Sequence, residues 1–66
     1  MNITLNGKAK PLHEPMTVSE LLKDLSIKPN TVVVELNTKI IQPDAYDTQK
    51  VSNADSMEII RFVGGG

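Results

Sequence analysis

Few side chains in this sequence could take part in catalysis. The 66 residues include no cysteine and one histidine, His13, so the chain has no thiolate nucleophile and no set of histidines for a metal ion. Its acidic residues are not clustered as a carboxylate metal site requires. The feature that could do chemistry is the last stretch, FVGGG (62–66), which ends on a main-chain carboxylate. We therefore expect no catalytic residue, no metal and no bound cofactor, and the chain is not predicted to be an enzyme.

The three glycines have two interpretations. They could be an idle, frayed terminus or the remnant of a linker, or the carboxylate of Gly66 could be the functional group. A linker usually continues past its glycines, whereas this chain finishes on them, which favours the second interpretation. Without a Cβ, Gly64, Gly65 and Gly66 form a thin segment, and they span about 10 Å when extended. The carboxylate would then reach into a partner's active site while a folded body stays outside.

The composition predicts one small domain over residues 1–63 and a flexible glycine tail over residues 64–66. A chain of this length is near the lower limit for an unaided core. Seven basic and eight acidic residues give a net charge of −1 without a basic patch, so nucleic acid is not an expected partner. No apolar run approaches the ~20 residues of a membrane-spanning helix, and the first residues do not resemble a signal peptide. We expect no membrane partner and a cytoplasmic location.

Residues 1–12 are predicted to form a β-hairpin. Apolar and polar residues alternate in MNITL (1–5), and Asn6-Gly7 follows, a pair that tolerates the positive φ angles of a two-residue turn. This register places Lys8 and Lys10 on the apolar face. Either their stems lie along the rim of the sheet or a bulge shifts the register. The pattern does not distinguish between the two.

Residues 16–25 are predicted to form a helix. Thr17 and Glu20 have the spacing of a capping box, in which each side chain bonds the other residue's main-chain N–H. Pro29 is expected to end the helix, because the residue before a proline is biased out of the α region. Apolar residues at i, i+3, i+4 and i+7 form one stripe for the core: Val18, Leu21, Leu22 and Leu25.

The remaining segments are predicted to be strands and turns. TVVVELN (31–37) has the β-branched composition of an interior strand, TKII (38–41) is a short return, and MEIIRFV (57–63) is the last strand. PDAYD (43–47) has turn chemistry, with Tyr46 expected in a small satellite of the core. One helix packed against one mixed sheet is a two-layer α+β arrangement.

Four segments also carry a resemblance to a known family: MNITLNGK at the start, TVSELL in the helix, VVVELNTKII in the middle and MEIIRFVGGG at the end. Together they resemble the β-grasp, ubiquitin-like proteins, and among these the ThiS family of sulfur carriers in thiamine biosynthesis. The ending is the most specific part, since family members finish on a strand followed by Gly-Gly. Two positions depart from the family: Ala54-Asp55, where Gly-Asp is common, and Asp44, where a basic residue is common. The resemblance implies a β-grasp fold with one main helix.

The resemblance further implies the chemistry of a sulfur carrier. Gly66 would be adenylated with ATP by a separate, ThiF-like adenylating enzyme and converted to a thiocarboxylate with sulfur from a sulfur-donating enzyme. The thiocarboxylate would then give its sulfur to a ThiG-like thiazole synthase for the thiazole of thiamine. Gly64 and Gly65 would enter the partners' active sites. ATP is used by the partner and is not a cofactor of the carrier.

The last strand offers a candidate docking surface. If Met57 and Ile59 point toward the helix, Ile60 and Phe62 point outward beside the tail. In the opposite orientation Ile60 and Phe62 belong to the core. We favour the docking interpretation, mainly because ubiquitin-like proteins bind partners on that face.

Other functions share the fold and the tail. A sulfur carrier for molybdopterin or cysteine biosynthesis would use the same chemistry, and the short length favours thiamine. A ubiquitin-like modifier would use the same adenylate with a lysine as acceptor. An interaction domain with an idle tail is a further alternative.

Overall fold

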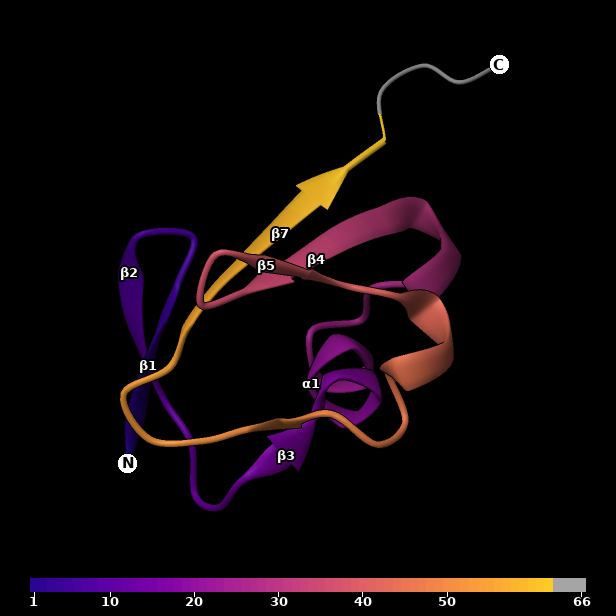
Figure 1. The fold of residues 1–66 in the computed structure, drawn as a ribbon. Helices are drawn as coiled ribbons and strands as arrows, with labels where there is room; N and C mark the ends of the chain where they lie inside the picture. Colours follow the sequence, from indigo (N-terminus) through magenta and orange to yellow (C-terminus); the bar gives the residue numbers. More distant parts are fainter. Residues whose placement is uncertain (63–66) are drawn as a thin grey trace.

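The structure, a computed structural model, describes residues 1–62. In this part of the chain a five-stranded mixed sheet has one α-helix packed on one of its faces (Figure 1). The strand order is β2-β1-β7-β4-β5, with β7 parallel to β1 and antiparallel to β4. The predicted α+β fold is therefore confirmed. The strands of this sheet are β1 (Asn2–Leu5), β2 (Lys8–Pro11), β4 (Val32–Leu36), β5 (Lys39–Ile41) and β7 (Ser56–Arg61).

The first hairpin has the predicted register. Leu5 lies opposite Lys8 and Ile3 lies opposite Lys10, without an extra residue in either strand. The turn residues Asn6 and Gly7 have φ angles of 48° and 81°, as a two-residue turn of this kind needs. The regular register excludes the bulge. Lys8 is exposed and Lys10 is half-buried, as the interpretation with lysine stems along the rim of the sheet requires for Lys10.

The helix α1 (Val18–Asp24) begins with the predicted capping box. Thr17 Oγ1 accepts a hydrogen bond from the Glu20 N–H at 3.0 Å, and the Thr17 N–H donates to Glu20 Oε1 at 2.8 Å. The second bond favours the ionised carboxylate, and it holds the pKa of Glu20 below its ordinary value. Two of the orphan N–H groups at the start of the helix are thereby satisfied.

The helix ends earlier than the sequence predicts. Its last residue is Asp24, and Ser26 takes a left-handed φ of 59°. The Ser26 N–H donates to the Lys23 carbonyl at 3.0 Å and the Ile27 N–H donates to the Leu22 carbonyl at 2.9 Å. These two bonds form a Schellman C-cap. The prediction that Pro29 ends the helix is wrong, because the C-cap closes the helix first.

A second, two-stranded ladder was not predicted. The strands β3 (Met16–Thr17) and β6 (Lys50–Val51) pair antiparallel and lie beside the start of α1. Two-residue strands are too short for a periodic pattern, so the sequence gives no signal for them. Two short 3₁₀ helices, η1 (Pro29–Thr31) and η2 (Pro43–Ala45), complete the connections, and η2 is the predicted turn around PDAYD.

The core lies between α1 and the inner face of the sheet. The Leu22 side chain is 0% exposed, as the predicted stripe requires, and Leu25 at the end of the stripe is half-buried. Tyr46 packs in the main core, so the predicted separate satellite is wrong. The buried apolar residues form one cluster: Ile3, Leu12, Val18, Leu21, Leu22, Val32, Val34, Leu36, Tyr46, Val51 and Met57.

Candidate docking site at the C-terminal strand

The strand β7 is both the middle strand of the sheet and the last strand that the structure describes. Its neighbours are β1 on one side and β4 on the other. One residue past β7, the Phe62 N–H still donates to the Thr31 carbonyl at 3.1 Å. The sheet thus fixes the position from which the following residues start. The predicted tail, Gly64, Gly65 and Gly66, and the domain boundary after Val63 lie outside the described residues.

The orientation of β7 is the predicted one. Met57 is buried on the helix side and Ile59 is half-buried, whereas Ile60 is 48% exposed on the opposite, outer face. Val33, which is half-buried, lies directly opposite Ile60 on β4. The two side chains form a small apolar patch on the outer face. The alternative in which Ile60 and Phe62 are core residues does not hold.

Phe62 is 60% exposed, but its surroundings differ from those of Ile60. It lines a hollow of about 360 Å³ at the end of the sheet, to which the core residues Val32 and Tyr46 also contribute. Ile60 does not line this hollow. The two predicted docking residues therefore present two adjoining surfaces, one on the outer face and one at the sheet's end. The remaining lining residues are Ser19, Pro29, Asn30 and Pro43.

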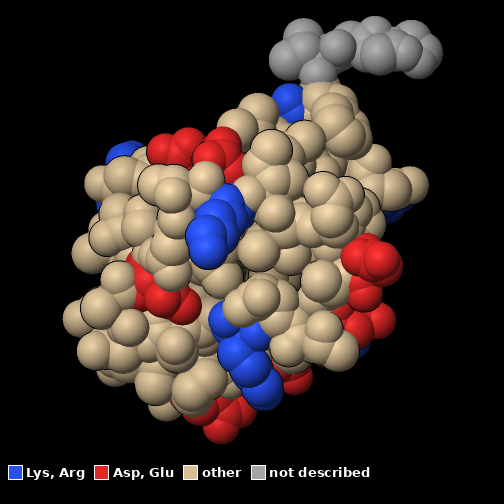
Figure 2. Space-filling model, in the orientation of Figure 1, with Lys and Arg blue, Asp and Glu red and all other residues tan. Residues whose placement is uncertain are grey.

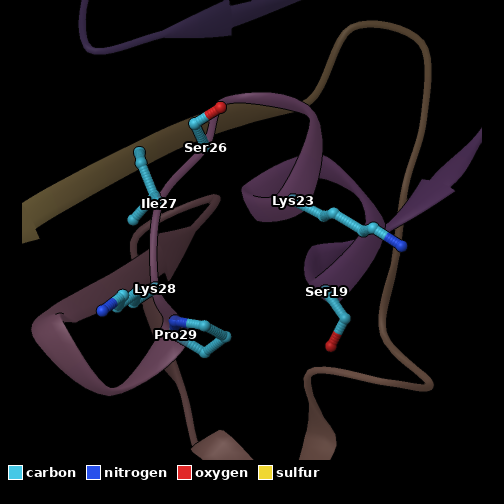
Figure 3. Close-up of a pocket in the computed structure, with 6 residues that line it drawn as sticks. All are labelled: Ser19, Lys23, Ser26, Ile27, Lys28 and Pro29. Carbon is cyan, nitrogen blue, oxygen red and sulfur yellow. The ribbon is translucent and has the colours of Figure 1, made fainter.

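A second hollow, of about 490 Å³, adjoins the first and shares Ser19 and Pro29 with it (Figure 3). It lies between α1 and the segment that follows the helix. The amino groups of Lys23 and Lys28 point away from each other in this view. The polar groups of the hollow thus do not converge on one point, as they do in a site for a small ligand.

The charges near β7 are few. Glu35 and Glu58 lie directly opposite each other on β4 and β7, next to the patch formed by Val33 and Ile60. Like charges in this position destabilise a sheet. Figure 2 shows the acidic and basic side chains scattered in small groups over the visible face, with a basic group beside the point where β7 ends. The last residue of β7 is Arg61. An apolar partner surface would complement the patch of Val33 and Ile60. A basic group on it would complement Glu35 and Glu58, whereas an acidic group would complement the exposed Arg61 at the end of β7.

The side chain of Asn6 completes the ladder between β1 and β7. Asn6 Oδ1 accepts from the Ile59 N–H at 2.8 Å, and Asn6 Nδ2 donates to the Ile59 carbonyl at 3.3 Å. The Asn6 N–H donates to the Met57 carbonyl at 2.9 Å. From the sequence, Asn6 is predicted only as a turn residue. Its second role depends on a strand that lies far away in the chain, and no local pattern reports it.

The described residues 1–62 contain no cluster of candidate metal ligands. This part of the chain has no group of three or more His, Cys, Asp or Glu side chains that could hold a metal ion. His13 is exposed in the loop between β2 and β3. Within the same residues, no helix has the length and apolar composition needed to cross a membrane.

The comparisons with known proteins agree on one family. The model of the ThiS family matches residues 3–66. The sulfur carrier protein ThiS of Bacillus subtilis is 35% identical over 97% of this chain and 98% of its own length. The crystal structure of the thiamine biosynthesis protein ThiS from Geobacter metallireducens superimposes with a TM-score of 0.88, at 38% identity and with both chains covered completely.

A larger relative matches as well. A thiazole synthase from Paramagnetospirillum magneticum is 35% identical over the whole of this chain, which spans only 20% of that protein's length. The fold and the exposed C-terminal strand define a small β-grasp protein. With the family model and the full-length relatives, the chain belongs to the ThiS family.

Proposed function

We propose that the chain is the sulfur carrier for thiazole formation in thiamine biosynthesis. The observation that carries the proposal is the match to a sulfur carrier protein over nearly the whole length of both chains. The absence of a thiol in the sequence is compatible with it, since the sulfur would be held on the main-chain terminus. The chain would act in the cytoplasm, where ATP is available to the adenylating enzyme.

The reaction proceeds in two steps at the carboxylate of Gly66. A carboxylate is a poor electrophile, so an oxygen of Gly66 first attacks the α-phosphorus of ATP in a ThiF-like adenylating enzyme. Pyrophosphate leaves and an acyl-adenylate remains. A sulfur nucleophile at the oxidation level of sulfide, supplied by a sulfur-donating enzyme, then attacks the acyl carbon. AMP leaves, and the product is the thiocarboxylate. The adenylating enzyme supplies the catalytic groups, and the carrier supplies a positioned terminus.

Thiazole synthase is the proposed acceptor of the sulfur. A thiazole synthase contains a segment similar to the whole of this chain, which supports an association between the two activities. In this chain the carrier domain would dock through Ile60 and Phe62. Gly64 and Gly65 would then lead the terminus into the active site, because residues without a Cβ fit a narrow channel.

The position of the carboxylate is the point to test. Misplacing a reacting atom by 1 Å can lower the rate about a hundredfold, and deleting Gly66 withdraws the carboxylate by about 3.5 Å. Adding an alanine after Gly66 extends the chain and introduces a Cβ. Both variants are expected to fold as the parent does and to lose ATP–pyrophosphate exchange with the adenylating enzyme.

Two further measurements make this test decisive. The intact mass of the protein from its own host should show that the chain ends at Gly66, and alkylation specific for thioacids should label the terminus. Full exchange with either tail variant, in a folded protein, would refute the proposed role of Gly66.

A further inference from the structure

Among residues 1–62, the hydrogen-bonding edge of β7 is incomplete at Arg61, near the end of the strand. Along β7, alternate residues turn their main-chain groups toward β4 and toward β1. The Phe62 N–H donates to the Thr31 carbonyl on the β4 side of β7. The N–H and carbonyl of Arg61, one residue earlier, therefore face the opposite side. That side is occupied by β1 at the beginning of β7. There β1 ends at Leu5. The main-chain groups of Arg61 thus lie beyond the end of their neighbouring strand.

Asn6 marks the position where this ladder stops. In a continuing parallel ladder, main-chain groups of β1 would bond both polar groups of Ile59 and then those of Arg61. The chain instead turns at Asn6-Gly7, and the Asn6 side chain takes the two bonds to Ile59. The next two bonds would involve the N–H and carbonyl of Arg61. These groups face the space beyond the Asn6-Gly7 turn, which we call the open lane. In Figure 1 the arrow of β7 extends past the β1–β2 hairpin toward the C-terminus.

The lane beside Arg61 is accessible. Asn6, Gly7, Lys8 and Arg61 are all exposed. A Cβ placed on Gly7 would meet no atom within 4 Å, so open space adjoins the hairpin turn. The two outer edges of the sheet are less suited to pairing, because β2 ends on Pro11 and β5 has three residues.

We propose that an edge strand of the adenylating enzyme adds to the sheet of the carrier in this lane and bonds the N–H and carbonyl of Arg61. The inference rests on the proposed function and adds a recognition mode to it. Addition of a strand binds through main-chain groups and fixes register. Register matters here, because β7 continues directly into the residues that carry the reacting carboxylate. The partner's strand would thereby set how far the terminus reaches.

The test uses backbone chemistry, since a side-chain change leaves the ladder groups in place. A chain of 66 residues is accessible to total chemical synthesis. One carrier has Arg61→Ala, and its matched variant has N-methylalanine at the same position, which removes the N–H and blocks the lane. The methyl group points away from β4, so the ladder to β4 is kept, and circular dichroism and thermal unfolding verify the fold. A second control has N-methylalanine in place of Ala9. Ala9 lies opposite Thr4, and the Thr4 N–H turns away from β2 to donate to the Asp55 carbonyl, so the two residues do not bond each other. The Ala9 N–H therefore faces the outer edge of β2.

The readout is the KM for the carrier in ATP–pyrophosphate exchange with the ThiF-like enzyme. Loss of the ladder bond with steric exclusion should raise KM about tenfold or more relative to Arg61→Ala, equivalent to ~1.4 kcal/mol. The variant at Ala9 should behave as the parent does. An equal KM for the two carriers with Ala and N-methylalanine at 61 would overturn the inference while leaving the proposed function intact.

Two other results would also overturn it. If the parent protein itself supports no ATP–pyrophosphate exchange, the proposed function is refuted. The inference that a partner strand binds beside Arg61 is then refuted as well. If the parent forms a dimer in solution that N-methylation at 61 abolishes, the strand belongs to a second copy of the chain. Sedimentation of the parent and the methylated variant over a range of concentrations separates that case.

Discussion

The side chain of Asn6 is hydrogen-bonded to both main-chain polar groups of Ile59, which lies 53 residues further along the chain. An asparagine in a turn is usually explained by its tolerance of positive φ, and Asn6 has a φ of 48°. Here the side chain also links the first turn to β7 through hydrogen bonds. The two contributions can be separated by mutation.

Asn6→Gly keeps the freedom at φ and removes both side-chain bonds. We expect it to lower the free energy of unfolding by about 1 to 3 kcal/mol, since each hydrogen bond contributes about 0.5 to 1.5 kcal/mol. Urea denaturation measures the change. Thr38→Gly is the control, because Thr38 has a φ of 72° in another two-residue turn. That variant should be neutral or stabilised, so a stable Asn6→Gly protein would show that the side-chain bonds contribute little.

Leu22→Ala tests the face of α1 that packs on the sheet. The Leu22 side chain is 0% exposed, and truncating a leucine in such a position costs about 2 to 5 kcal/mol through lost burial and a cavity. This is a large share of the stability of a small domain. Lys23→Ala, at the neighbouring exposed position, should change stability by less than about 0.5 kcal/mol. Similar losses in the two variants would contradict the observed orientation.

Ser26→Gly should stabilise the protein. Ser26 has the left-handed φ that closes the Schellman cap, and an L-residue in this region is strained by about 1 to 2 kcal/mol. Glycine has no such strain but loses more entropy on folding, by roughly 0.5 to 1 kcal/mol. The net gain in the free energy of unfolding should lie between about 0 and 1.5 kcal/mol. Ser26→Ala keeps the Cβ and should not show this gain, and thermal unfolding of both variants distinguishes the cases.

Phe62→Ala should weaken binding to the proposed adenylating enzyme by more than ~1 kcal/mol while changing the stability of this chain little. Phe62 is 60% exposed, so its truncation leaves the core intact. Ile40, at 61% exposed on the edge strand β5, is the matched control. Its replacement by alanine should alter affinity much less. Equal effects in titration calorimetry would mean that exposed apolar area, and not the place beside the tail, determines binding.

Much of the fold was predictable because its signals are local. The capping box of Thr17 and Glu20, the Asn6-Gly7 turn and the stripe containing Leu22 each fall within a few residues. Signals of this kind do not depend on the rest of the molecule. The outward direction of Ile60 follows from the same alternation once Met57 is placed on the helix side.

The errors and omissions concern interactions that no local pattern reports. The left-handed position of the C-cap, after the last helical residue Asp24, is a serine and not a glycine, so the usual signal for a C-cap was missing at Ser26. The β3–β6 ladder and the bonds from Asn6 to Ile59 join distant segments. Tyr46 is placed in the main core by tertiary packing, which turn chemistry in PDAYD does not reveal. For the candidate site, the sequence indicated the strand but not the separate surroundings of Ile60 and Phe62.

The central place of β7 has a consequence for biosynthesis. The strand that is translated last among the described residues inserts between β1 and β4, which are translated long before it. Until residues 56–61 have left the ribosome, β1 and β4 have no neighbour to join them into one sheet. Contacts of such large sequence separation also slow folding. A nascent chain that has not yet formed β7 therefore lacks the complete sheet, and with it the apolar patch that Val33 and Ile60 form across β4 and β7.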